Sequence, residues 1–163
     1  MSTMQSAAVA PERKSIVVNA SVEHAFRVFT EDFDGWWPRG HHIGKSPMTR
    51  AVIEPRKGGR CYSEQEDGTD CDWGQVLAWD PPRGLVIAWQ ISGQWEYEPD
   101  LAKSSEVEIR FTPQGTGTRV DLEHRHFERH GAGGALMRKG VDSPNGWADL
   151  LNQYAAYAEQ CAA

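Results

Sequence analysis

Histidines in the last part of the chain have the spacing that chemistry would need. His124 and His126 lie two positions apart in segment 118–127, where Val120 and Leu122 alternate with charged residues. In a strand this spacing puts both imidazoles on the covered face beside Val120 and Leu122. Imidazoles there can anchor a ligand or act as acid and base, so both are catalytic candidates. The alternatives are a buried neutral imidazole bonded to a backbone or tyrosine group and, for His126, exposure at the strand end.

A metal site is the second chemistry to weigh, because His41 and His42 add another pair in a loop. A His-x-His pair on one strand face can chelate, but zinc needs three or four converging ligands. Nothing in the sequence brings the two pairs together, and adjacent loop histidines are mostly solvated. The sequence therefore predicts no metal and no other cofactor.

Tryptophan is abundant, with seven residues, and its large rings line cavities as well as fill cores. Trp89 and Trp147 fall in strongly patterned elements, which also favours a core position for them. Trp95 lies in a polar segment, where its burial requires a ligand, a partner or a folded-over lid. Trp37 precedes a proline at a helix end and is expected at a cavity mouth. The predicted ligand-binding residues are Trp37, Tyr62, Trp73, Trp89, Trp95, Ile109, His124, Trp147, Leu151 and Tyr154.

Motifs for nucleophilic or phosphate chemistry are missing from the sequence. No serine lies in a Gly-x-Ser-x-Gly elbow, and no cysteine is visibly paired with a histidine and a carboxylate. The glycines at 58–59 and 131–134 are not followed by the Lys-Ser/Thr of a phosphate loop. Cys61, Cys71 and Cys161 form no CxxC pair, so free thiols are expected.

The net charge of −6 argues against binding to nucleic acid, because phosphate contacts need a basic face. The longest apolar stretches have the length of strands, and no basic amphipathic helix suits a membrane surface. The N-terminus lacks the pattern of a signal peptide. We therefore expect a cytoplasmic protein that binds neither nucleic acid nor membrane.

The elements that must position these residues follow from periodicity and turn signals. Asp67-Gly68 is a hairpin signal, and a two-residue turn there would place Tyr62 opposite Trp73. Residues 92–104 are expected as a loop, and 131–140 as a glycine-rich bridge. Strands are predicted at 14–19, 48–54, 60–65, 69–79, 85–91, 106–111 and 118–127, with a helix from Ser21 to about Asp34.

A final helix is predicted from Ser143 as N-cap and Pro144 at the first helical position. Its apolar stripe must be buried, and the preceding sheet is the only available cover. The order predicts an α+β fold with helices on one face of a curved antiparallel sheet: a flexible tail over 1–13 and a single domain over 14–163. The stripe consists of Trp147, Leu150, Leu151, Tyr154, Ala158 and Cys161.

The chain resembles the START-like, or SRPBCC, superfamily, and more narrowly the family named after the C-terminal domain of the activator of the heat-shock protein 90 ATPase. The resemblance implies a helix-grip fold, shared with the birch-pollen allergen, in which a curved sheet grips the long C-terminal helix above a cavity. The matching pieces are Ala20-Ser21-Val22-Glu23-His24-Ala25-Phe26, Trp36-Trp37, Gly58-Gly59-Arg60, Trp73-Gly74-Gln75-Val76, Trp79-Asp80-Pro81-Pro82, Leu85, Trp89, Ser105-Glu106-Val107-Glu108, Gly117-Thr118-Arg119-Val120, His124, Gly146-Trp147 and Leu150-Leu151.

Binding of a small hydrophobic or aromatic molecule in that cavity is the function we expect, with burial of apolar area supplying the affinity. A cyclase, hydratase or hydrolase using the same cavity, with His124 or His126 as acid or base, is one alternative. A co-chaperone-like module that docks a protein partner through its wet strand face is the other. A homodimer is compatible with the exposed sheet edges.

Overall fold

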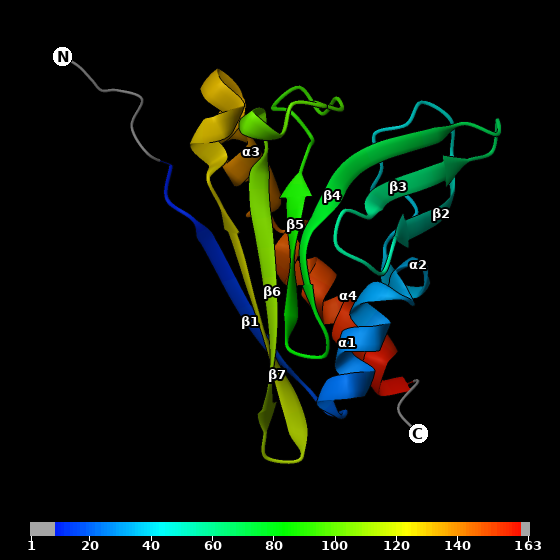
Figure 1. Cartoon of the computed structure of the whole chain (residues 1–163), viewed down its shortest axis with the longest axis vertical. Helices are drawn as coiled ribbons and strands as arrows, with labels where there is room; N and C mark the ends of the chain where they lie inside the picture. The colour runs from blue at the N-terminus through cyan, green and yellow to red at the C-terminus, as the bar shows by residue number, and fades with distance from the viewer. Residues whose placement is uncertain (1–8, 161–163) are drawn as a thin grey trace.

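The computed structural model describes residues 9–160, which form one seven-stranded antiparallel sheet in the order β1-β7-β6-β5-β4-β3-β2 (Figure 1). The first and last strands of the order are therefore the two edges. The strands are β1 (Glu12–Val18), β2 (Met48–Ile53), β3 (Arg60–Gln65), β4 (Asp70–Asp80), β5 (Gly84–Trp89), β6 (Ser105–Gln114) and β7 (Gly117–Arg125).

The helices lie on one face of this sheet, with α4 running beneath the strands and beside α1 (Figure 1). Ser21 caps α1, because its hydroxyl accepts the His24 N–H at 3.1 Å. This arrangement confirms the α+β, helix-grip expectation. The helices are α1 (Val22–Thr30), α2 (Phe33–Trp36), α3 (Gly134–Val141) and α4 (Trp147–Gln160), with 3-10 turns η1 (Leu101–Lys103) and η2 (Phe127–Gly133).

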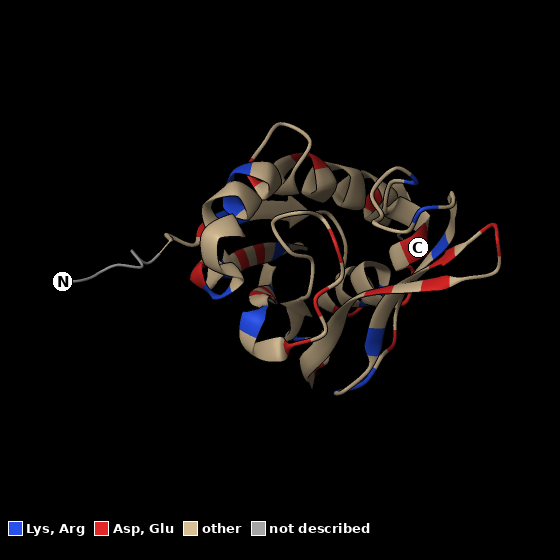
Figure 2. Cartoon of the chain, turned by 90° about the horizontal axis from the view of Figure 1, so that it is seen from above, with Lys and Arg blue, Asp and Glu red and all other residues tan. Residues whose placement is uncertain are grey.

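Alternation along β6 and β7 separates a dry face from a wet one. Val107, Ile109 and Phe111 are buried under the helices. The opposite face carries ion pairs, in which Arg125 contacts both Glu106 and Glu108, at 3.2 and 2.5 Å. Acidic and basic residues are interspersed over the molecule (Figure 2). The carboxylates of the wet face are thus already paired within the chain.

The final helix begins later than the sequence predicted. Ser143 is not its N-cap: its hydroxyl donates to the Gly140 carbonyl at 2.7 Å, and α4 starts at Trp147. Residues 143–146 form a turn instead, in which a Cβ on Gly146 would lie 2.0 Å from the Val141 carbonyl. The close approach of the backbone at residue 146 to the Val141 carbonyl requires glycine there. Residues 143–146, which were expected to form the first turn of the helix, therefore lie outside it.

The glycine-rich segment 131–140 was expected as a bridge, and that prediction is wrong. Its residues fold into the end of η2 and the helix α3, which packs Met137 and Val141 into the core. Gly131, with φ at 70°, is a non-helical residue that kinks η2 in its interior. Apolar residues at helical spacing outweigh the glycines, because burial of Met137 and Val141 stabilises the helix by tertiary packing.

The register of the β3–β4 hairpin also differs from the prediction. Tyr62 lies opposite Asp72, not Trp73. The loop takes three residues, because Gln65 and Thr69 pair directly and Gly68 adopts a positive φ of 86°. A bulge follows, because Cys61 pairs with Gly74 and Tyr62 with Asp72, so that Trp73 has no residue opposite it on β3. The Trp73 side chain is buried.

The segment that precedes the sheet is held by α3. Strand β1 starts at Glu12, and Arg138 donates to the carbonyls of Ala10 and Pro11 at 2.7 and 3.3 Å. Glu12 is 2% exposed, and its carboxyl has no hydrogen-bond partner of ordinary geometry in residues 9–160. Burial, with the nearby Asp142 carboxylate, raises the pKa of Glu12 to about 8. The rest of the predicted tail, residues 1–8, lies outside the described residues.

Two of the three cysteines can be placed. Cys61 is buried and Cys71 is half-buried, and both are free thiols. Cys161, the last member of the predicted stripe, lies outside the described residues. Within residues 9–160 no helix is both long enough and apolar enough to cross a bilayer.

Candidate binding cavity

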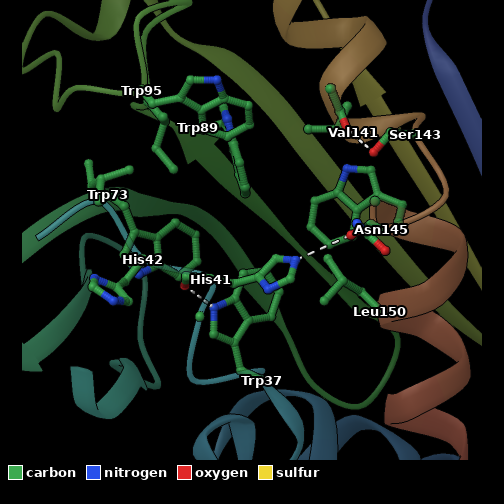
Figure 3. A pocket seen from close by; sticks show the side chains of 16 residues that line it. Trp37, His41, His42, Trp73, Trp89, Trp95, Val141, Ser143, Asn145 and Leu150 are labelled. Carbon is green, nitrogen blue, oxygen red and sulfur yellow. Dashed lines mark hydrogen bonds between the residues drawn. The ribbon is translucent and has the colours of Figure 1, made fainter. Parts of the chain in front are cut away.

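A cavity of about 360 Å³ lies between the sheet and the start of α4. Figure 3 shows its walls, with Trp37, Trp73 and Trp95 on one side of the view and Val141, Asn145 and Leu150 on the other. The described lining contains no Asp, Glu, Lys or Arg side chain. The lining residues are Trp37, Gly40, His41, His42, Ile43, Trp73, Trp89, Ile91, Trp95, Gly140, Val141, Ser143, Asn145, Gly146, Trp147 and Leu150.

Four indoles in this lining form a closed ring of contacts. Centroid distances are 6.1 Å from Trp37 to Trp73, 5.7 Å from Trp73 to Trp89, 5.6 Å from Trp89 to Trp147 and 6.2 Å from Trp147 back to Trp37. The four residues come from the α2–β2 loop, two adjacent strands and the first residue of α4. We call these four residues the four-tryptophan ring. Two of the four contacts are edge-to-face, the Trp37–Trp73 pair is stacked and the Trp147–Trp37 pair is tilted. Edge-to-face and offset-stacked pairs are the arrangements that the aromatic quadrupole favours.

Beneath the four-tryptophan ring, side chains fill nearly all of the protein interior. The same four indoles also border a deeper void of about 10 Å³, which Ile109 lines from β6. Leu151 and Tyr154 fill the core rather than border the cavity, and the Tyr154 hydroxyl donates to the Ala25 carbonyl at 2.7 Å. The tryptophans therefore take up the space under the helix and leave the larger cavity at its N-terminal end.

One contact crosses the cavity between segments far apart in the chain, and a second lies within the α2–β2 loop. His41 Nε2 lies 3.2 Å from the Asn145 carbonyl, so the α2–β2 loop is tied to the turn before α4 (Figure 3). The Trp37 indole donates to the His41 carbonyl at 2.8 Å, which orients that loop. Together the two contacts give the His41 imidazole a fixed position in the cavity wall.

Trp95 borders the cavity from the β5–β6 connection. It is 50% exposed and holds a left-handed backbone with φ at 61°, which is uncommon for a residue other than glycine. Its indole lies against Gly140 of α3, where an added Cβ would come within 3.0 Å of the ring. Trp95 thus lies in the loop that the sequence predicted, half-exposed, and the prediction that a ligand, a partner or a lid buries it stays a prediction.

His124 is fully buried but does not line the cavity, because Trp147 stands between them. Its Nδ1 accepts the Trp147 indole N–H at 3.1 Å and its Nε2 lies 2.7 Å from the Ser105 hydroxyl. That hydroxyl also lies 2.8 Å from His130 Nε2. Burial holds the pKa of His124 well below its ordinary value, and nearby His130 adds to this effect. A neutral, doubly hydrogen-bonded imidazole supports the cavity wall.

His126 and Tyr62 lie away from the cavity. Strand β7 ends at Arg125, and His126 has a left-handed φ of 65° that breaks the alternation and leaves its side chain 40% exposed. The prediction that both histidines share the covered face is therefore wrong for His126. The Arg60 guanidinium lies over the Tyr62 ring, with its Cζ atom 4.1 Å from the centroid of that ring.

Of the predicted binding residues, five tryptophans border the cavity, namely Trp37, Trp73, Trp89, Trp95 and Trp147. Sequence reasoning weighed His41 and His42 only as metal ligands and did not consider Asn145 or Val141. In residues 9–160 no group of three metal-ligating side chains comes together. The signal for His41 was its place next to the Trp36-Trp37 pair, but its partner at residue 145 is far away in sequence.

A curved antiparallel sheet that grips a C-terminal helix over an apolar cavity defines the START-like, helix-grip class of α+β proteins. Within that class the chain belongs to the family described as activator of Hsp90 ATPase homolog 1-like protein, whose model matches residues 19–159. No curated protein sequence matches the chain.

Solved structures include relatives with clear sequence similarity. An anthrahydroquino-γ-pyrone synthase, Txn09, is 42% identical, with 94% of this chain and 99% of that one covered and a TM-score of 0.65. A self-sacrificing resistance protein, CalC from Micromonospora echinospora, is 32% identical, with 94% and 96% covered and a TM-score of 0.67. Protein NE0264 from Nitrosomonas europaea, at 16% identity with 92% and 94% covered and a TM-score of 0.65, shares the fold alone.

Proposed function

We propose that the cavity binds a flat, uncharged aromatic molecule of more than one ring. The observation that carries the proposal is the lining: five indoles border one cavity whose described walls hold no Asp, Glu, Lys or Arg. Aromatic walls favour planar partners, which stack or meet them edge-to-face. A ligand that buries about 200 Å² of apolar surface gains about 5 kcal/mol before the cost of association.

One relative supports a polyketide-like aromatic as the ligand class. The 42% identical protein is named a synthase of an anthrahydroquino-γ-pyrone, which is a fused, oxygenated ring system. The cavity volume of about 360 Å³ lies within the range of pockets that hold small organic ligands. We assign the protein to the cytoplasm as part of this proposal, because Cys61 and Cys71 are free thiols.

The test is a panel of planar polycyclic aromatics, measured by thermal unfolding and by equilibrium dialysis. A ligand at about 100 times its Kd stabilises the folded state by about 2.7 kcal/mol, so the Tm should rise. Ile43→Trp, which places a bulky ring into the cavity, should abolish the rise. Val17→Trp, at an exposed site on β1, should leave it unchanged. If no planar aromatic raises the Tm or is retained in dialysis, the proposal is wrong.

A cyclase-type enzyme is the second candidate, and the synthase relative is the observation that favours it. His124 and His126 cannot serve as its acid and base at the cavity, since one is walled off and the other lies outside. His41 and His42 border the cavity and are the groups that could transfer a proton to or from a bound carbonyl compound. Under this candidate, replacing either by Phe abolishes turnover of a polyketide substrate while its Kd changes little. Unchanged turnover in both variants would exclude it.

A further inference from the structure

The indole nitrogens of the buried tryptophans differ in one respect. Three of them donate hydrogen bonds: Trp36 to the Val28 carbonyl at 3.1 Å, Trp37 to the His41 carbonyl at 2.8 Å, and Trp147 to His124 Nδ1 at 3.1 Å. Nε1 of Trp89 is buried as well, yet it has no hydrogen-bond partner in the part of the chain that the structure describes. Trp89 is 5% exposed and borders the cavity.

A buried donor without an acceptor is costly. Leaving one unsatisfied destabilises the folded protein, and native proteins pair the large majority of such groups. Three aromatic rings surround Trp89 edge-to-face, with centroids 5.7 Å away for Trp73, 5.3 Å for His124 and 5.6 Å for Trp147. A ring face is only a weak acceptor, so these neighbours do not replace an oxygen.

A second unpaired nitrogen belongs to the same cavity lining. His42 Nδ1 is buried and has no partner within residues 9–160. The other polar side chains of the lining are His41, Ser143 and Asn145. Two lining residues with unmet polar atoms indicate that a guest with oxygen atoms completes the hydrogen bonding. The described lining offers no fixed charge that would do so instead.

We propose that the N–H of Trp89 donates a hydrogen bond to an acceptor oxygen on the bound aromatic, such as a ring carbonyl. It thereby selects oxygenated ring systems over hydrocarbons of the same shape. This inference rests on the proposed binding function and names the chemistry that the cavity recognises. Because Nε1 is buried, its donation to a guest requires a local side-chain shift. Trp95 is the wall indole that is half-exposed, so a shift of its side chain uncovers the fewest core contacts.

The test compares two shape-matched tricyclic probes, 9-fluorenone and fluorene, which differ by a carbonyl oxygen. Equilibrium dialysis should show that the wild-type protein binds fluorenone about tenfold more tightly, the fold-change expected of one hydrogen bond. Trp89→Phe should reduce this ratio to about one. Trp37→Phe is the matched control: its indole also borders the cavity, but its N–H already has a partner. Trp37→Phe should weaken the binding of both probes by the same factor, so that the ratio of the two affinities stays as in the wild-type protein.

Infrared spectroscopy supplies an independent readout. The carbonyl stretch of fluorenone bound to the wild-type protein should lie at lower frequency than in an alkane solvent, and Trp89→Phe should return it toward the alkane value. Equal affinity for both probes, a ratio that survives Trp89→Phe, or an unshifted band would overturn the inference while the binding function stands. Failure of both probes to bind would overturn both proposals. If Trp89→Phe does not fold, the band position in the wild-type protein decides.

Discussion

The indole nitrogen of Trp147 donates to Nδ1 of His124 across 3.1 Å, and this contact fixes the role of the histidine. Because Nδ1 accepts, the imidazole proton lies on Nε2 and is donated to the Ser105 hydroxyl. The hydroxyl can then donate to His130 Nε2. The chain of bonds runs in one direction from the cavity wall toward η2, and its function is to hold Trp147 in place.

Replacing His124 by Phe should lower stability and change its pH dependence. The substitution leaves the N–H of Trp147 unpaired, at a cost of about 1–3 kcal/mol near pH 8. In the wild-type protein the folded-state pKa of His124 lies well below 6.5, so the unfolded chain binds the proton more tightly. Stability from this site is complete above pH 6.5 and is lost by up to about 1.4 kcal/mol per pH unit below it. Urea unfolding from pH 8 to 5 measures the effect.

The control for this prediction is Val17→Phe, at an exposed site on β1 whose side chain carries no ionisable group. It should leave the pH dependence as it is in the wild-type protein. The His124 variant should lose less stability on acidification than the wild-type protein does. Parallel curves for the wild type and His124→Phe would show that His124 is not held neutral.

Glu12→Gln should act in the opposite pH range. The folded-state pKa of Glu12 is raised to about 8 from 4.5, so the folded protein holds the proton more tightly than the unfolded chain. Its contribution is therefore fully present below about pH 4.5 and is lost as pH rises toward about 8, by about 1.4 kcal/mol per unit. The variant should match the wild type near pH 4.5 and exceed its stability by several kcal/mol at pH 9.

Chemical unfolding at pH 4.5, 7 and 9 tests this expectation. Glu23→Gln, on the exposed face of α1, is the matched control and should show no such gain at high pH. A Glu12→Gln protein that is no more stable than the wild type at pH 9 would mean that the carboxylate finds favourable partners after ionisation.

Two glycines near the cavity should respond differently to alanine. Gly140→Ala meets only the outer edge of the half-exposed Trp95 ring, at 3.0 Å, and that ring can move. The gain in helix propensity is up to about 1 kcal/mol, so stability should stay within about 1 kcal/mol of the wild type. Gly146→Ala puts a methyl group 2.0 Å from the Val141 carbonyl and should cost at least about 2 kcal/mol. Thermal unfolding of both variants measures the difference, and equal losses would contradict it.

Thiol labelling should distinguish the two described cysteines. Burial raises the pKa of both thiols, and Cys61 is completely buried while Cys71 is half-buried. Since the thiolate is the reactive form and must also be reached, an alkylating reagent at pH 8 should modify Cys71 well before Cys61. Peptide mass spectrometry over time reads the order. Labelling of Cys61 at the same rate would indicate frequent opening of the β2–β3 edge.

The sheet and the gripped helix could be predicted because their signals are local. Alternation along β6 and β7 and the stripe from Trp147 to Ala158 each report burial within one element. Predictions failed where a neighbour decided the backbone. The start of α4 depends on how closely Gly146 approaches Val141, and the β3–β4 register depends on a third loop residue at Glu66.

The cavity could be predicted only in composition. An excess of tryptophan indicated an aromatic wall, and Trp95 stood out in its polar loop. The contact between His41 and Asn145 spans 104 positions, and no local pattern reports a pairing of that range. The prediction that His124 lines the cavity was wrong. Alternation along a strand shows which face of the sheet a side chain is on, but not how far from the cavity it lies, and here the Trp147 side chain lies between His124 and the cavity.

The four-tryptophan ring also affects the fluorescence of the protein. Chromophores whose centroids lie 5.6 to 6.2 Å apart exchange excitation energy faster than they emit. Light absorbed by Trp37, Trp73, Trp89 or Trp147 is therefore shared among the four before it leaves the protein. If the proposed ligand accepts energy from any one of them, the emission of all four should fall, so tryptophan fluorescence would report whether the cavity is occupied.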